Sequence, residues 1–270
     1  MGQHSGKCAL CRNACQLTFE HIPPRAAFNS TPARPVSGEK LFHDDNRMPW
    51  DTEGLFYSNQ QQGMGKYSLC KNCNNNTGAW YGDSYITFSR IVHSVLKDVI
   101  DEKHSGFGIK EVYPLRIIKQ VLSMFCSINN VEDERINTLR EFVLNKEATG
   151  LDRSKYKVCL YLTRSKLMKY APISVVLRSS ERGVESMALS EITAYPLGLI
   201  LYFNPTDTWV YDGIDITSFS DCKYDAIATV EMPLCILEMN DVFPTFFRTK
   251  EDIVHYVESN KNAGDDFESN

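Results

Sequence analysis

Four of the nine cysteines form two Cys-x-x-Cys pairs, Cys8/Cys11 and Cys70/Cys73. Each pair can direct two sulfurs at one ion, and four thiolates are the ligand set of a tetrahedral structural zinc site. A single ion that is held by both pairs joins two segments that lie far apart in the chain. The sequence therefore predicts a structural Zn²⁺ site formed by Cys8, Cys11, Cys70 and Cys73.

Three residues with hydrolytic chemistry lie near these cysteines. Glu20 and His21 lie between the two pairs, and Asn74 directly follows the last cysteine. A histidine whose pKa is near neutrality can take a proton from water. A divalent cation can neutralise the charge on a phosphate and on the leaving oxygen. If the zinc site brings these residues together, they form a candidate nuclease centre.

Residues from about 5 to 90 resemble the HNH (ββα-metal, His-Me finger) endonucleases whose finger is held by a four-cysteine zinc site. The likeness rests on the cysteine pairs, on the E-H-I-x-P segment that begins at Glu20, and on the C-N-N-x-x-G segment that begins at Cys73. The resemblance implies that His21 is the general base. It also implies that Glu20 and Asn74 hold one catalytic Mg²⁺ or Mn²⁺ ion, for which oxygen ligands are suited.

Each of these residues has a second interpretation. A Glu-His dipeptide is usually a solvated surface pair, and Asn74 can cap the helix that follows it. Cys15 can compete with Cys8 or Cys11 for zinc. A non-catalytic zinc ribbon that binds nucleic acid or protein needs only the cysteines, and it stays the alternative to an enzyme.

Two features depart from the pattern of the family. Many HNH sequences carry an Asn five residues before the third cysteine, and the contacts of this Asn orient the catalytic histidine. The residue at this position is Gly65, and Asn59 is a candidate substitute. The interval from His21 to Asn74 is also longer than in compact members. We expect an insertion around residues 29–60 that contacts DNA or covers the site.

The charge distribution bears on a nucleic-acid partner. The net charge is −5, but residues 1–90 hold nine Lys and Arg against seven Asp and Glu. The excess of positive charge thus falls on the segment that carries the cysteine pairs. Among its cations we expect Arg25 and Lys71 to contact the phosphates of DNA. The sequence does not distinguish DNA from RNA as the substrate.

Hydrophobic periodicity predicts an α+β fold. An N-terminal zinc-held ββα-metal finger should be followed by helices and then by mainly antiparallel strands. We expect a strand at 16–19, helices at 74–100, 112–128 and 132–144, and strands at 156–162, 173–177, 186–191, 197–203, 208–211 and 226–237. This divides the chain into an HNH endonuclease domain (1–103), an α+β domain of unknown role that can carry a homodimer interface (104–259), and a disordered tail (260–270).

Composition sets the remaining expectations. No segment approaches the ~18–20 apolar residues of a membrane span, and the N-terminus lacks the apolar core of a secretory signal. We therefore expect a cytoplasmic protein that has no membrane partner and whose scattered cysteines are reduced. The sequence as a whole predicts a metal-dependent endonuclease that acts on DNA. Restriction or anti-phage defence is suggested by analogy only.

Overall fold

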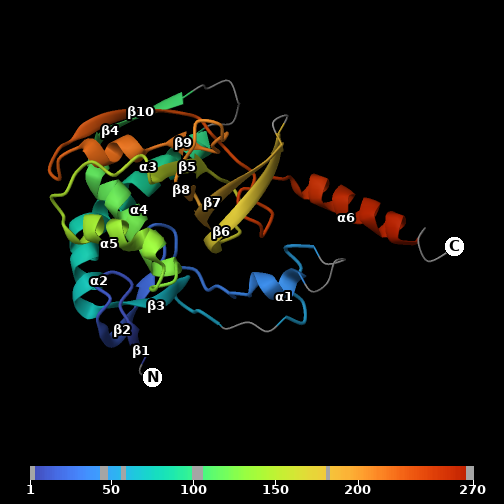
Figure 1. Cartoon of the computed structure of the whole chain (residues 1–270), viewed down its shortest axis with the longest axis horizontal. Helices are drawn as coiled ribbons and strands as arrows, with labels where there is room; N and C mark the ends of the chain where they lie inside the picture. The colour runs from blue at the N-terminus through green and yellow to red at the C-terminus, as the bar shows by residue number, and fades with distance from the viewer. Residues whose placement is uncertain (1–3, 43–47, 56–58, 99–105, 181–182, 266–270) are drawn as a thin grey trace.

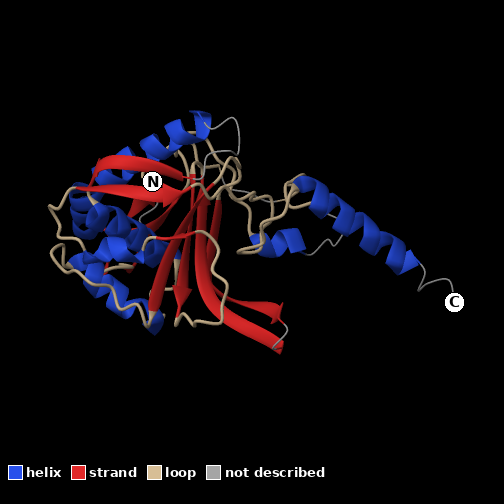
Figure 2. Ribbon diagram, turned by 90° about the horizontal axis from the view of Figure 1, so that it is seen from above, coloured by secondary structure: helices blue, strands red, loops and turns tan. Residues whose placement is uncertain are grey.

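The computed structural model describes residues 4–42, 48–55, 59–98, 106–180 and 183–265, and it has the predicted α+β class with antiparallel sheets (Figure 1). Its strands form three sheets, in the orders β1-β2-β3, β10-β4 and β6-β7-β8-β5-β9. Helices α2 to α5 gather on one side of the five-stranded sheet, and α6 projects from the other side (Figures 1 and 2). Among the described residues, no helix combines the length and the hydropathy that crossing a bilayer requires.

The N-terminal part of the chain is built from a three-stranded antiparallel sheet and the helices that follow its strands. Its elements are β1 (Ser5–Lys7), β2 (Ala14–His21), α1 (Gly38–Phe42), β3 (Gly65–Cys70), α2 (Lys71–Thr77), the π-helical turn η1 (Gly78–Gly82) and α3 (Asp83–Asp98). Strand β3 pairs antiparallel with β2 and passes directly into α2. The predicted single helix is therefore three consecutive helical segments, and the π turn coincides with a Gly-x-x-x-Gly stretch.

The middle of the chain is mainly helical. It contains β4 (Gly106–Val112), α4 (Pro114–Ile128), the 3₁₀ turn η2 (Glu134–Ile136) and α5 (Asn137–Leu144). Both predicted helices are present, and Pro114 begins α4 at the position where a missing N–H has no consequence. The sequence did not predict β4, because its glycines are typical of a turn. Gly106 is needed there, since a Cβ atom would lie 2.8 Å from the Met232 carbonyl oxygen of the paired strand β10.

The last part of the chain carries the large sheet. Its elements are β5 (Tyr156–Leu162), β6 (Lys169–Ser180), β7 (Gly183–Ala194), β8 (Leu197–Phe203), β9 (Ile214–Asp215), η3 (Thr217–Asp221), β10 (Ala228–Pro233) and α6 (Lys250–Asp265). The predicted bounds of β5 and β8 are confirmed. The strand predicted at 208–211 is wrong, because this segment is a turn in which Trp209 is buried. Helix α6 extends into the segment predicted as a tail, and residues 266–270 lie outside the described residues.

One cluster of buried apolar side chains connects the N-terminal part to the large sheet. It runs from Cys8 through the whole of α4 to Met232, and so it crosses residue 103, where the sequence places a domain boundary. Every residue of α4 except Arg116 is buried. Helix α4 is therefore the central element against which the segment of the cysteine pairs packs, and the boundary itself stays a prediction.

A buried arginine fastens the turn of the first cysteine pair to α5. The guanidinium of Arg140, which is 3% exposed, donates to the main-chain oxygens of Ala9 (2.9 Å) and Val131 (2.7 Å). It also reaches the carbonyls of Asn130 and Asp133, both at 3.4 Å. Charged donors to several buried carbonyls form strong hydrogen bonds, and removal of the donor leaves those carbonyls unsatisfied.

We therefore expect Arg140→Leu to lower the free energy of unfolding by about 3 kcal/mol in denaturant titrations. Arg135→Ala is the matched control, because Arg135 is half-exposed and its side-chain ion pair with Asp133 lies at the surface. The control should lose less than about 1 kcal/mol. Equal losses for the two variants would contradict a special role for Arg140.

Candidate metal and nuclease site

The four paired cysteines form one cluster, in which all the sulfur atoms lie within 4.8 Å of one another. Cys8 and Cys11 come from the turn between β1 and β2, whereas Cys70 ends β3 and Cys73 lies in the first turn of α2. The Cys70 N–H donates to the Cys8 sulfur (3.3 Å), and the Cys73 N–H donates to the Cys70 sulfur (3.4 Å). Such donors stabilise thiolates, so the cluster can hold a metal ion such as zinc.

Two alternatives from the sequence are resolved by this cluster. Cys15 does not belong to it, although it is partly buried nearby. Asn74 does not cap α2, because Cys70 occupies the cap position and its sulfur accepts from the Cys73 N–H. The Asn74 side chain is therefore available for another role.

Glu20 is a buried carboxylate and not a solvated surface residue. Its side chain is 5% exposed, and its Oε2 accepts hydrogen bonds from the hydroxyls of Ser68 on β3 (3.1 Å) and Ser127 at the end of α4. Burial raises the pKa of Glu20 to about 7, although both hydroxyls act in the opposite direction. Without a cation nearby, the carboxyl is thus partly protonated at neutral pH. Its Oε1 accepts no hydrogen bond from the described residues.

The hydrogen bonds of Asn74 fix the orientation of its amide. Nδ2 donates to the Thr18 hydroxyl (3.0 Å) and to the Phe19 carbonyl oxygen (3.3 Å). The Thr18 hydroxyl donates its own proton to Leu69, and a carbonyl can only accept, so the nitrogen of Asn74 must face β2. The Oδ1 atom is consequently left free for a ligand.

His21 ends β2 with one ring nitrogen unpaired. Burial lowers the pKa of His21, the main-chain carbonyl of Gln62 raises it, and the charge of Arg25 lowers it again. Nε2 is buried and has no hydrogen-bond partner among the described residues. The ring also packs edge-on against Phe19, with the centroids 5.1 Å apart. This environment favours a neutral imidazole with a free basic nitrogen.

Glu20, His21 and Asn74 line one cavity of about 310 Å³. The other residues of its wall come from β2, from the turn after it and from four helical segments: Phe19, Pro24, Arg25, Thr77, Gly78, Gly82, Asp83, Ile86 and Gln120. The sequence predicted the first three residues and Arg25 for a common site, and all four line this cavity. Lys71 is exposed at the start of α2 and does not line it.

The structure explains why the expected orienting Asn is absent. A Cβ atom at Gly65 would lie 2.1 Å from the Glu20 carbonyl oxygen and 2.8 Å from the Phe19 ring, so only glycine fits at this position. The candidate substitute, Asn59, is exposed. The contact to His21 comes from the Gln62 main chain, which no residue type in the sequence could have indicated.

Asn29 is a buried residue at the start of the insertion, and its side-chain amide joins two segments of the chain. The Asn29 amide donates to the carbonyls of Pro23 and Met64 (both 2.7 Å) and accepts from the Met64 N–H (2.7 Å). Gly63, the residue before Met64, has φ +103°, and a Cβ atom at this position would collide with the Asn29 main chain. These hydrogen bonds join the first residue of the insertion to the segment that leads into β3. The sequence analysis did not find Asn29, Ser68, Ser127 or Gln120.

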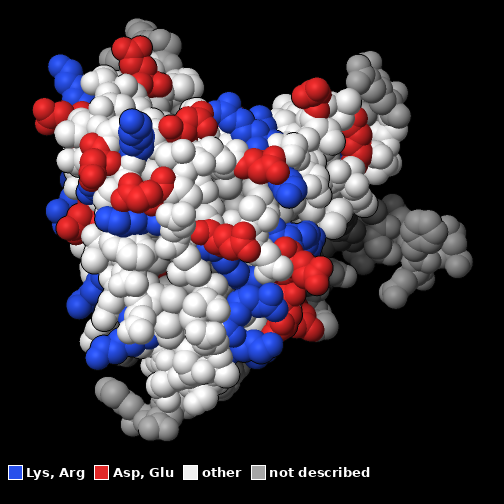
Figure 3. Space-filling model, turned by 60° about the vertical axis from the view of Figure 1, so that its left-hand side comes forward, with Lys and Arg blue, Asp and Glu red and all other residues white. Residues whose placement is uncertain are grey.

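Other residues considered from the sequence have structural roles. The Tyr81 ring is buried and its hydroxyl donates to the Val143 carbonyl oxygen (2.7 Å), so Tyr81 is a core residue. Lys66 donates to the Ile128 carbonyl at the end of α4 (3.2 Å). The cluster His43-Asp44-Asp45 lies outside the described residues. Acidic and basic groups are intermingled on the side of the molecule that carries α2 and α5 (Figure 3).

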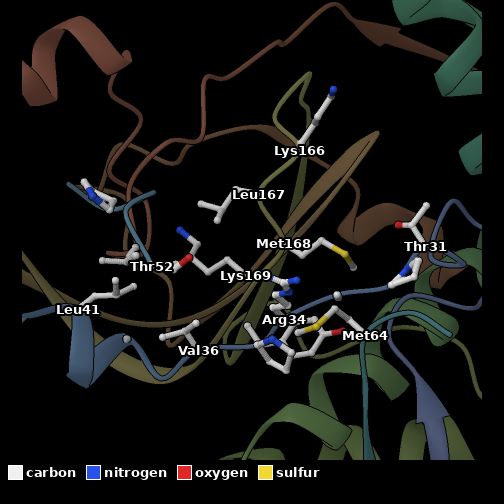
Figure 4. Close-up of a pocket in the computed structure, with 17 residues that line it drawn as sticks. Thr31, Arg34, Val36, Leu41, Thr52, Met64, Lys166, Leu167, Met168 and Lys169 are labelled. Carbon is white, nitrogen blue, oxygen red and sulfur yellow. The ribbon is translucent and has the colours of Figure 1, made fainter. Parts of the chain in front are cut away.

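A larger hollow of about 480 Å³ lies between the insertion and the segment that leads into β6 (Figure 4). Val36, Leu41, Met64 and Met168 contribute to its apolar wall. Lys169 lies at its edge and is paired with the buried Glu191 at 3.0 Å. No His, Cys, Asp or Glu is among its described lining residues.

No protein-family model, curated protein or solved structure matches this chain. The arguments about its chemistry therefore rest on the geometry of its own residues.

We expect elemental analysis of the purified chain to find one structural zinc ion. Cys70→Ser should lose this ion, because its thiolate is one of the four ligands, whereas Cys15→Ser should keep it. Such sites supply on the order of 10 kcal/mol, so a strong chelator should unfold the segment of the cysteine pairs. A circular-dichroism spectrum that stays unchanged after confirmed zinc removal would contradict a structural metal.

Proposed function

We propose that the chain is a metal-dependent endonuclease of the HNH type that hydrolyses phosphodiester bonds in DNA. The observation that carries the proposal is the single cavity lined by Glu20, His21 and Asn74. Strand β2 supplies the first two residues and helix α2 supplies the third. The order β2, β3, α2, with a cysteine cluster at the β3–α2 junction, supports a ββα-metal finger.

The oxygen atoms in the cavity suit a hard divalent cation. No described residue donates a hydrogen bond to Glu20 Oε1 or to Asn74 Oδ1. Mg²⁺ or Mn²⁺ would accept such a pair of oxygens together with several waters. Among the described residues, only the cysteines place three His, Cys, Asp or Glu ligand atoms within 4.8 Å. A two-oxygen site fits this finding. When bound, the cation supplies charge neutralisation at the phosphate and at the leaving oxygen.

The His21 side chain has the properties of a general base. Its lowered pKa favours the neutral ring, and the buried Nε2 has no hydrogen-bond partner among the described residues. This nitrogen would take the proton of a water molecule bound in the cavity. The Gln62 carbonyl holds the ring in place from the other side. Arg25 is exposed at the wall of the same cavity, where it can contact a phosphate of the substrate. Lys71 is exposed at the start of α2 and does not line the cavity, so it would contact the nucleic acid outside it.

A non-catalytic zinc ribbon remains the competing function, and one observation favours it. The two serine hydroxyls on Glu20 satisfy one of its oxygens, as expected of a purely structural buried carboxyl. The endonuclease needs a second metal site besides the zinc site, whereas the zinc ribbon does not, so the detection of such a site distinguishes the two functions. For the enzyme we propose restriction or anti-phage defence by analogy, and parallel digests of DNA and RNA establish the substrate.

Replacing His21 with Ala should reduce Mg²⁺-dependent cleavage of plasmid DNA by at least about 100-fold, because the general base is removed. Zinc content and thermal stability should stay near those of the wild type. His255→Ala is the matched control, since His255 is exposed on α6, and it should cleave normally. Undiminished cleavage by the His21 variant would refute the assignment.

Glu20→Gln should abolish the binding of Mn²⁺ measured by calorimetry on the zinc-loaded chain, because the substitution removes the negative charge of the carboxylate ligand and leaves two neutral amide oxygens to hold the ion. The isosteric amide can still accept from both serines, so folding should be retained. Asn75→Ala should bind Mn²⁺ like the wild type, as Asn75 is exposed one residue beyond Asn74. If the wild type binds no Mn²⁺, the result favours the non-catalytic zinc ribbon over the endonuclease.

A further inference from the structure

Helix α4 carries a polar stripe although it is buried along its length. Gln120, Ser123 and Ser127 are spaced by three and four residues, so they lie on one face of the helix. Ser127 donates to Glu20. Lys119 is the other buried polar residue of α4, and it has a separate structural role. Its Nζ donates to the carbonyl oxygens of Asn145 and Lys146 at the end of α5.

Gln120 is the member of the stripe that reaches the cavity. It is 4% exposed, and it lines the same wall as Glu20, His21 and Asn74. Its Oε1 is buried and has no hydrogen-bond partner among the described residues. An amide oxygen without a partner is costly to bury, and such groups are rare in native proteins. Because Gln120 lines the cavity, a group that occupies the cavity is the candidate partner of this oxygen.

The proposed cation site suggests a hydrogen-bond donor for the Gln120 amide oxygen. Mg²⁺ and Mn²⁺ prefer six ligands, and Glu20 and Asn74 supply only two protein oxygens, so water or substrate completes the shell. A metal-bound water is a strong hydrogen-bond donor that needs an acceptor. The cavity of about 310 Å³ is large enough for an ion with several waters. The Gln120 amide oxygen offers such an acceptor on the wall contributed by α4.

We propose that Gln120 is a positioning residue of the nuclease centre, whose amide oxygen accepts a hydrogen bond from a water molecule in the hydration shell of the bound divalent cation. This inference rests on the proposed function. It extends the centre beyond residues 1–103, since Gln120 and Ser127 both belong to α4. Ser127 then holds the carboxylate ligand, and Gln120 holds the hydration shell.

The test measures Mn²⁺ affinity of the full zinc-loaded chain by calorimetry, without nucleic acid, together with thermal unfolding in the absence of Mn²⁺. Gln120→Met keeps the size of the side chain but removes the acceptor. We expect its Kd for Mn²⁺ to rise about 10- to 100-fold, the usual effect of losing an outer-shell partner. Its melting temperature should not fall, because an unsatisfied polar group has been removed. An unchanged Kd would overturn the proposal.

Ser123→Ala is the matched control. Ser123 lies one turn farther on the same face, is fully buried, and has an unpartnered hydroxyl, but it does not line the cavity. Its Kd for Mn²⁺ should equal that of the wild type, and a Kd raised as much as in Gln120→Met would overturn a specific role for Gln120. Gln120→Glu keeps an oxygen acceptor and should bind Mn²⁺ at least as tightly as the wild type. If Gln120→Met does not fold, Gln120→Glu decides the test by itself, and weaker Mn²⁺ binding by this variant than by the wild type overturns the proposal.

Different results would refute the proposed cation site and the proposed role of Gln120. If Glu20→Gln abolishes Mn²⁺ binding and Gln120→Met does not weaken it, the role of Gln120 is refuted while the proposed cation site stands. If the wild-type chain binds no Mn²⁺, the cation site is refuted, and the role of Gln120 is refuted with it.

Discussion

The position of α2 relative to β2 depends on the cysteine cluster. Its sulfur atoms come from the β1–β2 turn, from the end of β3 and from the first turn of α2, so one bound metal ion would fix all three segments. Asn74 is the residue directly after the last of these sulfurs, and its amide is therefore held against Thr18 and Phe19. The small strand-strand-helix unit has few apolar residues of its own, and the rest of its rigidity comes from packing against α4.

The sequence predicted the parts of the fold and site that depend on residue type and local spacing. Strands β5 and β8 have near-continuous apolar runs, and α4 has an apolar pattern with Pro114 at its start, so their bounds could be read directly. The paired cysteines, Glu20, His21 and Asn74 could be identified because thiols, carboxylates, imidazoles and amides have distinctive chemistry. The elements that failed, β4 and the turn around Trp209, owe their structure to distant partners and not to local propensity.

The residues that support the site could not be predicted for the same reason. Ser127 reaches Glu20 across a separation of 107 residues, and serine in a helix carries no signal of such a partner. Gln62 acts through a main-chain carbonyl, which every residue possesses. Gly65 departs from the family pattern because Phe19 and the Glu20 carbonyl fill the space of a side chain. Only the three-dimensional arrangement shows that the main chain of Gln62 lies close enough to raise the pKa of His21.

The burial of Glu20 links stability to the proposed function. A carboxyl whose pKa is raised to about 7 is held in its ionised form at a free-energy cost in the metal-free protein. The native state binds this proton more tightly than the unfolded chain does, so the contribution of Glu20 to stability falls as the pH rises from its ordinary pKa to about 7. A divalent cation reverses this preference, because it favours the ionised carboxylate. The two serine hydroxyls hold the carboxylate in place in both states, and they leave one oxygen to face the cavity. The cost of ionisation in the metal-free protein is thus the physical quantity by which a bound cation would change the stability of the chain.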